Sequence, residues 1–197
     1  MKLITRTIPL ILVLVALAGC MPFVLRTDEP RFSSEEYRFP LAEGHYVFDS
    51  LPQKSAVFSR RANSANIALY EQDDQPPSTL TGGFIPLRIP GYFIFQATDM
   101  VDAKGKSDKE PGETTYFPAH VDAGGVTWYS GPKNCRAECD ALFAAHGYTR
   151  DEKGGWREPS SPSADRIKAF YEDLAELMER LPAADAWESL RMTPSER

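Results

Sequence analysis

The chain has little that would direct it to nucleic acid or hold it across a membrane as a helix. Its 197 residues include 22 Lys and Arg against 28 Asp and Glu, a formal charge of −6. A protein without a basic excess is a poor partner for nucleic acid. The one long apolar run, from Ile8 to Ala18, has eleven residues, whereas a helix that crosses the hydrocarbon core needs about 20. A permanent transmembrane helix is therefore not expected.

Motifs of common catalytic and metal sites are also absent from the sequence. No serine sits in a G-x-S-x-G elbow and no P-loop is present. The three histidines, His45, His120 and His146, lie far apart and form no ligand-spaced pair. The sequence thus predicts no catalytic residue, no metal site and no separate cofactor. One alternative stays open, a hydrolase built around His120, with Asp122 two residues away on the same face of an extended strand.

The first 19 residues have the layout of a secretory signal peptide. A basic head with Lys2 and Arg6 precedes the apolar run, and two small residues precede Cys20. The sequence LAGC at 17–20 resembles the lipobox of bacterial lipoproteins. The resemblance implies cleavage before Cys20, a diacylglycerol on its sulfur and an acyl chain such as palmitate on its new amino group. Several acyl chains on one residue would form a durable anchor without a spanning helix.

Met21 bears on the membrane that holds the anchor. In the lipoproteins that the motif resembles, an aspartate at this position commonly retains the protein in the inner membrane. The resemblance therefore implies the outer membrane, with the protein on its periplasmic face, and leaves the inner membrane and the cell surface as alternatives. Loss of Lys2 and Arg6 with the signal leaves 20 basic residues against 28 acidic ones, a charge of about −8. The membrane is thus reached through the lipid rather than through a basic patch.

Cys135 and Cys139 remain after Cys20 is assigned to the anchor. A local disulfide between them is favoured because free thiols do not persist in an oxidising compartment. On a regular helix their Cβ atoms would lie about 5–6 Å apart, more than the roughly 3.5–4.5 Å of a disulfide, so the bond needs a loosened first turn. Two buried thiols, or half of a metal site, are the alternatives.

The composition divides the chain into a signal peptide at 1–19, a lipidated tether at 20–42 and a single periplasmic α+β domain at 43–197. Short apolar runs bounded by Gly, Pro, Asp and Ser predict an antiparallel meander of about six or seven strands. These runs begin at His45, Ser55, Ala65, Phe84, Tyr92, Thr115 and Val126. Pro86 and Pro118 lie inside two runs and cannot donate to a ladder. An open or irregular sheet is therefore expected rather than a closed barrel.

One or two helices are expected after the meander. The first is predicted from Pro132 to about His146, and the second begins at Ser161 or Ser163 and ends before Pro182. The second has one apolar stripe and an acidic polar face, which favours packing on the sheet over binding to a membrane surface. The stripe contains Ile167, Phe170, Tyr171, Leu174, Leu177, Met178 and Leu181.

The order of these features resembles a set of small, uncharacterised lipoproteins of proteobacteria. The residues that carry the resemblance are Gly44, Tyr46, Phe48, Gly91, Tyr92, Pro132, Cys135, Gly147, Tyr148 and Thr149. It covers most of the mature chain and implies no activity. Relatives of this kind are expected to have a second cysteine in the hairpin after the first helix. This chain has Trp156 there, which leaves the disulfide partner of Cys135 open.

Three functions follow, in order of preference. The first is a membrane-anchored envelope lipoprotein that acts as a binding or interaction module, with another envelope protein as partner. The second is a lipocalin-like carrier of a small apolar ligand, and the third is the hydrolase around His120. For the carrier, the candidate ligand contacts are Tyr92, Phe95, Tyr116 and Trp128, because aromatic residues on a curved sheet can enclose an apolar molecule.

Overall fold

The computed structural model describes residues 23–72, 75–107, 112–133, 136–150, 156–181 and 186–195. The predicted signal peptide, Cys20 and Cys135 lie outside this part of the chain. Within the described part, no helix is long and apolar enough to cross a membrane.

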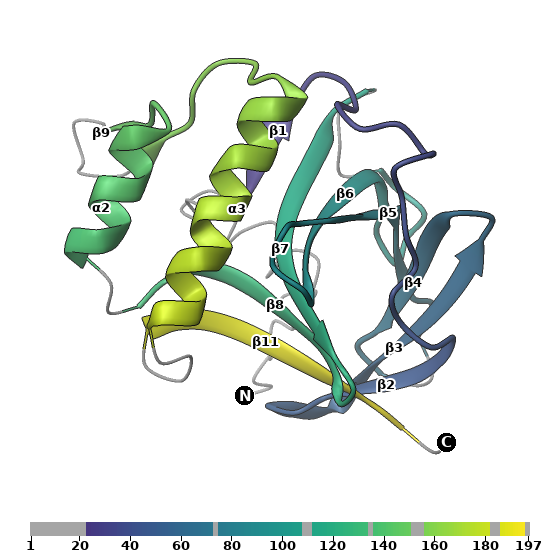
Figure 1. Cartoon of the computed structure of the whole chain (residues 1–197). Coiled ribbons are helices and arrows are strands. Elements are labelled where there is room, and N and C mark those ends of the chain that lie inside the picture. The colour runs from purple at the N-terminus through teal and green to yellow at the C-terminus, as the bar shows by residue number, and fades with distance from the viewer. Residues whose placement is uncertain are drawn as a thin grey trace, which may run out of the picture.

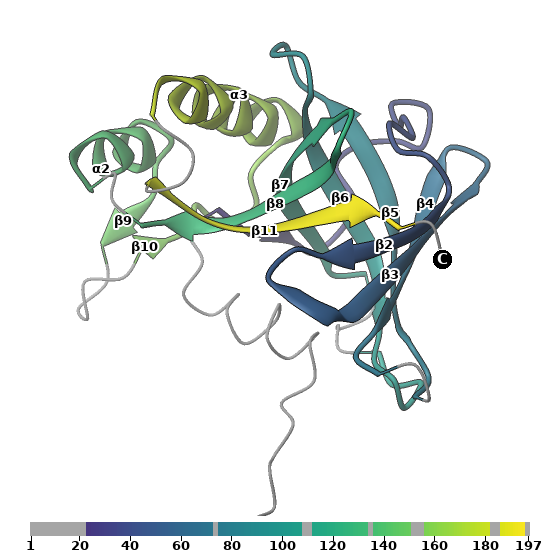
Figure 2. The ribbon, with the colours of Figure 1, turned by 90° about the horizontal axis from the view of Figure 1, so that it is seen from below.

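Eight antiparallel strands close into a barrel (Figure 1, Figure 2). They are β2 (Gly44–Phe48), β3 (Leu51–Arg61), β4 (Ser64–Tyr70), β5 (Ser78–Pro86), β6 (Tyr92–Val101), β7 (Thr114–Asp122), β8 (Gly125–Pro132) and β11 (Trp187–Pro194). Each strand from β2 to β8 pairs with the next in the chain, and β11 pairs with both β8 and β2. The antiparallel meander and the α+β class are confirmed, whereas the estimate of six or seven strands was too low.

The expectation of an open sheet was wrong because β11 joins the two ends of the meander. Its partners are six residues of β8 and three of β2. Glu188 and Arg191 interrupt its apolar pattern, so no strand is predicted there from the sequence. Pro118 does mark an irregularity, as expected. It lies between the part of β7 that pairs with β8, from Ala119 onward, and the part that pairs with the short strand β1 (Leu25–Thr27).

Alternation along the strands separates two hydrophobic cores. On β4, for example, Ala65, Ile67 and Leu69 are buried while their neighbours are only partly so. Such inward-facing residues fill the barrel and form the inner core. Its buried members are Val24, Leu41, Tyr46, Phe48, Ala56, Phe58, Ala65, Ile67, Leu69, Leu80, Phe84, Phe95, Ala97, Met100, Phe117, Ala119, Val126 and Met192. Small and large side chains are mixed in this set, as a narrow barrel requires.

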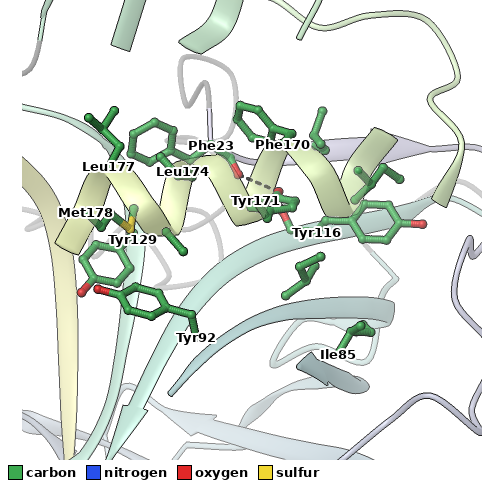
Figure 3. Close-up of a cluster of buried hydrophobic side chains, with 14 of the residues drawn as sticks. Phe23, Ile85, Tyr92, Tyr116, Tyr129, Phe170, Tyr171, Leu174, Leu177 and Met178 are labelled. Atoms are coloured by element: carbon green, nitrogen blue, oxygen red, sulfur yellow. Dashed lines mark hydrogen bonds between the residues drawn. The ribbon is translucent and has the colours of Figure 1, made fainter. Parts of the chain in front are cut away.

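Two helices, α2 (Arg136–Ala145) and α3 (Ala164–Arg180), lie between β8 and β11 in the chain, with a small hairpin of β9 (Thr149–Arg150) and β10 (Trp156–Arg157). Both predicted helices are present, but Pro132, expected in the first turn of the first helix, belongs to β8 instead. Ser163 caps α3 by accepting a hydrogen bond from the backbone N–H of Arg166 (3.4 Å). The predicted stripe of α3 is buried against the outside of the barrel, and Figure 3 shows it above Ile85, Tyr92 and Tyr116. We call the buried residues between α2, α3 and the outside of the barrel the outer core. Its buried members are Phe23, Leu25, Phe32, Tyr37, Ile85, Tyr92, Ile94, Tyr116, Tyr129, Cys139, Phe143, Tyr148, Ile167, Phe170, Tyr171, Leu174, Ala175, Leu177, Met178, Ala186 and Trp187.

The segment expected as a tether belongs to the fold from Phe23 onward. Phe23, Val24 and Leu25 are at most 2% exposed, and the segment 23–42 (the N-terminal segment) also buries Phe32, Tyr37 and Leu41. Gln96 of β6 holds it: the Gln96 side-chain oxygen accepts from the backbone N–H groups of Arg31 (3.1 Å) and Phe32 (3.0 Å). The segment contains several prolines and no helix or strand periodicity, which is why a tether is predicted from the sequence. Its aromatic residues nevertheless hold it against the barrel by packing.

Candidate functional site

A group of aromatic rings lies inside the barrel where β5, β6 and β8 face one another. The Phe84 ring lies 4.8 Å from Phe95, 5.8 Å from Trp128 and 6.0 Å from Phe93, measured between centroids. Trp128 meets Phe95 edge-on at 5.4 Å. Phe84 and Phe95 are fully buried, whereas Phe93 and Trp128 are only partly buried at the border of the inner core. We call these four residues the interior aromatic cluster.

The register of the strands shows how this cluster is spaced. Phe93 faces Ala119, Ala119 faces Trp128, and Trp128 faces Leu190, in one row across β6, β7, β8 and β11. Directly opposite residues have Cβ atoms about 4.5–5.5 Å apart. The small Ala119 therefore separates two large aromatic side chains, and the fully buried Phe84 contacts both of their rings. Leu190 extends the row and is also partly buried.

Trp128 carries the one polar atom of the cluster. Its indole Nε1–H is buried and has no hydrogen-bond partner within the described residues. A buried donor without a partner costs about 1–3 kcal/mol relative to a satisfied one. An apolar molecule with a hydrogen-bond acceptor would satisfy this donor and contact the surrounding rings.

The four residues predicted as ligand contacts do not form one site. Phe95 and Trp128 meet inside the barrel, whereas Tyr92 and Tyr116 face outward into the core under α3, as Figure 3 shows for these two. Tyr92 and Phe95 are three residues apart on one strand and so lie on opposite faces. Phe84, Phe93 and Leu190 are not among the residues predicted from the sequence, although the alternation along the run that begins at Tyr92 places Phe93 on the same face as Phe95.

The two outward tyrosines have structural partners. The Tyr116 hydroxyl accepts from the Arg31 backbone N–H (3.0 Å) and shares a hydrogen bond with Thr27 Oγ1 (3.1 Å). Burial raises the pKa of Tyr116, and burial together with Tyr129 and the Glu179 carboxylate raises the pKa of Tyr92. Both phenols therefore stay neutral and hold the packing of the outer core.

His120 does not form the dyad that a hydrolase would need with Asp122. Its ring lies against Tyr92, with centroids 4.6 Å apart. The Asp122 carboxylate instead accepts from both terminal nitrogens of Arg191 (2.8 and 3.1 Å) and from the Gly124 backbone N–H (2.7 Å). The hydrogen bonds from Arg191 are the main cause that lowers the pKa of Asp122. Its carboxylate thus joins the turn between β7 and β8 to β11.

The cysteines and the possible metal ligands are the remaining candidates from the sequence. Cys139 is 1% exposed and disulfide-bonded. Its expected partner Cys135 lies outside the described residues, so this pairing stays a prediction, as does lipidation of Cys20. Where the chain is described, no group of three or more His, Cys, Asp or Glu side chains is placed to hold a metal ion. His146 instead pairs with Asp173 on α3 (2.9 Å).

No family model, curated protein or solved structure matches this chain. The interior aromatic cluster is therefore defined by its geometry alone.

Proposed function

We propose that this chain is a lipid-anchored envelope protein whose barrel binds a small apolar ligand that carries a hydrogen-bond acceptor. The lipid is attached to Cys20 and holds the protein on the periplasmic face of the outer membrane. The observation that supports ligand binding is the buried indole N–H of Trp128, which has no partner in the described chain and lies against Phe84 and Phe95. A fatty acid or another chain with an oxygen-bearing head has this chemistry.

The size of the interior limits the ligand. An eight-stranded barrel is just wide enough to be filled by side chains or to hold one small molecule. Large residues such as Tyr46, Phe48 and Phe58 are at most 2% exposed and occupy much of this interior. The partly buried Phe93, Trp128 and Leu190 mark the section that a ligand can contact. One alkyl chain or one ring fits this description better than a bulky lipid.

Ligand binding is favoured over a purely protein-binding role because the barrel is closed. Within the described chain, each of the eight barrel strands pairs on both sides, so another protein could add a strand only beside the short strand β1 or the β9–β10 hairpin. A protein partner bound to the outer surface remains the alternative, and the binding test below separates the two.

The test uses two fluorescent probes, a dansyl-labelled fatty acid and N-phenylnaphthylamine, which lacks an acceptor such as a carboxylate. We expect the fatty acid to bind the parent protein and to change Trp fluorescence. Trp128→Phe keeps the ring but removes the N–H, so its affinity should fall by about 5-fold to 10-fold, the value of one hydrogen bond. The same substitution should leave the binding of N-phenylnaphthylamine nearly unchanged.

Two further variants make this test specific to the interior. Trp156→Phe is the matched control, because Trp156 lies outside the barrel under the Arg150 guanidinium (4.1 Å). It should bind both probes as the parent does. Ala119→Leu adds volume between Phe93 and Trp128 and should weaken both probes. If neither probe binds, or if Trp128→Phe and Trp156→Phe behave alike, the carrier function is wrong and the interaction module is favoured.

The anchor has a separate test. Cys20→Ser should release the protein from the membrane fraction, and the mass of the parent should include the diacylglycerol and the acyl chain. A Cys20→Ser protein that stays in the membrane with its signal peptide attached would contradict lipid anchoring.

A further inference from the structure

The fold already includes the third residue after the predicted lipid anchor. Phe23, only three residues after Cys20, is 0% exposed. Its ring lies 5.8 Å from the ring of Phe143 on α2 and 5.7 Å from that of Trp187 on β11. Its carbonyl oxygen accepts a hydrogen bond from the Tyr171 hydroxyl (2.7 Å). Position 23 is therefore fixed within the outer core.

This short link sets the distance between the domain and the bilayer. An extended chain spans at most about 3.3–3.6 Å per residue, so the Cα atom of Phe23 can lie no more than about 10–11 Å from that of Cys20. The polar headgroup layer on each side of a bilayer is roughly 5–8 Å thick. A lipid on Cys20 thus brings Phe23 to the level of the headgroups or directly above them.

The surroundings of Phe23 identify the side of the domain that must approach the bilayer. Trp187 is paired with Pro132 at the end of β8, and the backbone N–H of the exposed Lys133 donates to the Ala186 carbonyl oxygen (2.7 Å). Figure 2 shows α2 on this side of the molecule, with β2, β3 and β4 at the opposite side. We define the anchor-side surface by its exposed residues at the end of β8 and on α2, which are Lys133, Ala137, Glu138, Ala141, Ala144 and Ala145.

We propose that the anchor-side surface lies against the phospholipid headgroups, so that the barrel is held on the membrane in one orientation with no spacer. This inference rests on the proposed lipidation of Cys20. The acyl chains supply the binding free energy, about 0.8 kcal/mol for each buried methylene, so this surface needs no basic patch of its own. The net negative charge of the domain makes zwitterionic lipid the favoured contact.

The experiment places the lipidated protein in vesicles of phosphatidylcholine and phosphatidylethanolamine that contain a phosphatidylcholine with a diazirine in its headgroup. After illumination, mass spectrometry locates the labelled peptides. Peptides that contain Lys133 or α2 should be labelled at least several-fold more than the peptide that contains the hairpin of β3 and β4, whose residues Arg61, Ala62 and Asn63 are exposed.

A spacer variant is the matched comparison. A flexible Gly/Ser insertion of about 20 residues between Cys20 and Phe23 has a mean span of about 25 Å, which lets the domain turn and move away from the surface. The labelling ratio should then fall towards one, while circular dichroism and flotation with the vesicles stay unchanged. Equal labelling of the two sides in the parent, or an unchanged ratio in the spacer variant, would overturn the proposed orientation.

The mass of the intact protein separates failure of this inference from failure of the proposed anchor. A protein that carries the lipid and floats with the vesicles, but is labelled evenly, disproves only the orientation. A protein whose Cys20 carries no lipid disproves the anchor and, with it, the orientation. Neither result changes the binding of the fatty-acid probe by the barrel.

Discussion

Replacement of Tyr171 by phenylalanine tests whether the contacts of the N-terminal segment contribute to the stability of the fold. Tyr171 is 1% exposed, and its hydroxyl contacts the carbonyl oxygens of Phe23 (2.7 Å) and Tyr116 (2.9 Å). Figure 3 shows this hydroxyl under α3 beside Phe23. Burial raises the pKa of Tyr171 well above its usual value, so the phenol stays protonated and donates throughout the pH range of an unfolding experiment.

The loss of this hydroxyl leaves two buried carbonyl oxygens without their donor. Each unsatisfied group costs about 1–3 kcal/mol, but the single proton is shared between them, so we expect Tyr171→Phe to lower the free energy of unfolding by about 2 kcal/mol. For a domain of this size, that corresponds to a decrease of roughly 4–8 °C in Tm. Urea and thermal denaturation followed by circular dichroism would measure both values.

Tyr148 provides the matched control within the same core. It is 5% exposed and packs against Phe143 and Phe170, but its hydroxyl has no hydrogen-bond partner in the described residues. Tyr148→Phe should therefore change the free energy of unfolding by less than about 0.5 kcal/mol or increase it. The reasoning is refuted if the two variants lose equal stability, or if Tyr171→Phe is as stable as the parent.

Three further predictions concern single groups. Gln96→Leu removes the hydrogen bonds to the N-terminal segment, so it should lower the free energy of unfolding by about 2–4 kcal/mol and make that segment accessible to trypsin. Thr98→Ala, at an exposed position of the same strand, should have neither effect. Burial raises the pKa of Glu158, so the folded state binds this proton more tightly and stability should fall as pH rises from about pH 4 through the folded pKa. Glu158→Gln should abolish that fall, and an unchanged pH profile would contradict it. Reduction of the disulfide of Cys139 should cost about 2 kcal/mol if Cys135 closes the loop, and non-reducing peptide mapping that joins Cys139 to another cysteine would reject this pairing.

The parts of the fold that depend on local periodicity could be predicted from the sequence. The stripe from Ile167 to Met178 identified α3 and its buried face, because the pattern and the Ser163 cap agree. The alternation of Ala65, Ile67 and Leu69 likewise identified β4. Closure of the barrel could not be predicted in this way. It depends on β11, which pairs with strands far away in the chain and whose sequence, with Glu188 and Arg191, does not alternate cleanly.

In the candidate site, too, some residues could be predicted from the sequence and others could not. Phe95 and Trp128 were selected as aromatic residues of the sheet, and the barrel brings them together at 5.4 Å. Tyr92 and Tyr116 were selected on the same ground, but their register turns them outward to α3. Composition identifies which side chains can contact a ligand, whereas the face of each strand decides which of them do. Phe84 could not be found in the same way, because its importance arises only from its contacts with two rings on β6 and with Trp128 of β8 across the barrel.

The sequence predicts that the domain starts at residue 43, whereas Phe23, the first residue that the structure describes, is already buried. A chain that begins at residue 43 lacks six buried hydrophobic side chains, Phe23, Val24, Leu25, Phe32, Tyr37 and Leu41. Burial of a large apolar side chain contributes about 1.5–3 kcal/mol, so their loss removes about 9–18 kcal/mol. The whole stability of a domain is only about 5–15 kcal/mol. We therefore expect this shortened chain to lose its near-ultraviolet circular dichroism and cooperative unfolding, while a chain that begins at Phe23 keeps both. Equal unfolding transitions for the two chains would mean that the N-terminal segment packs on a barrel that is stable without it.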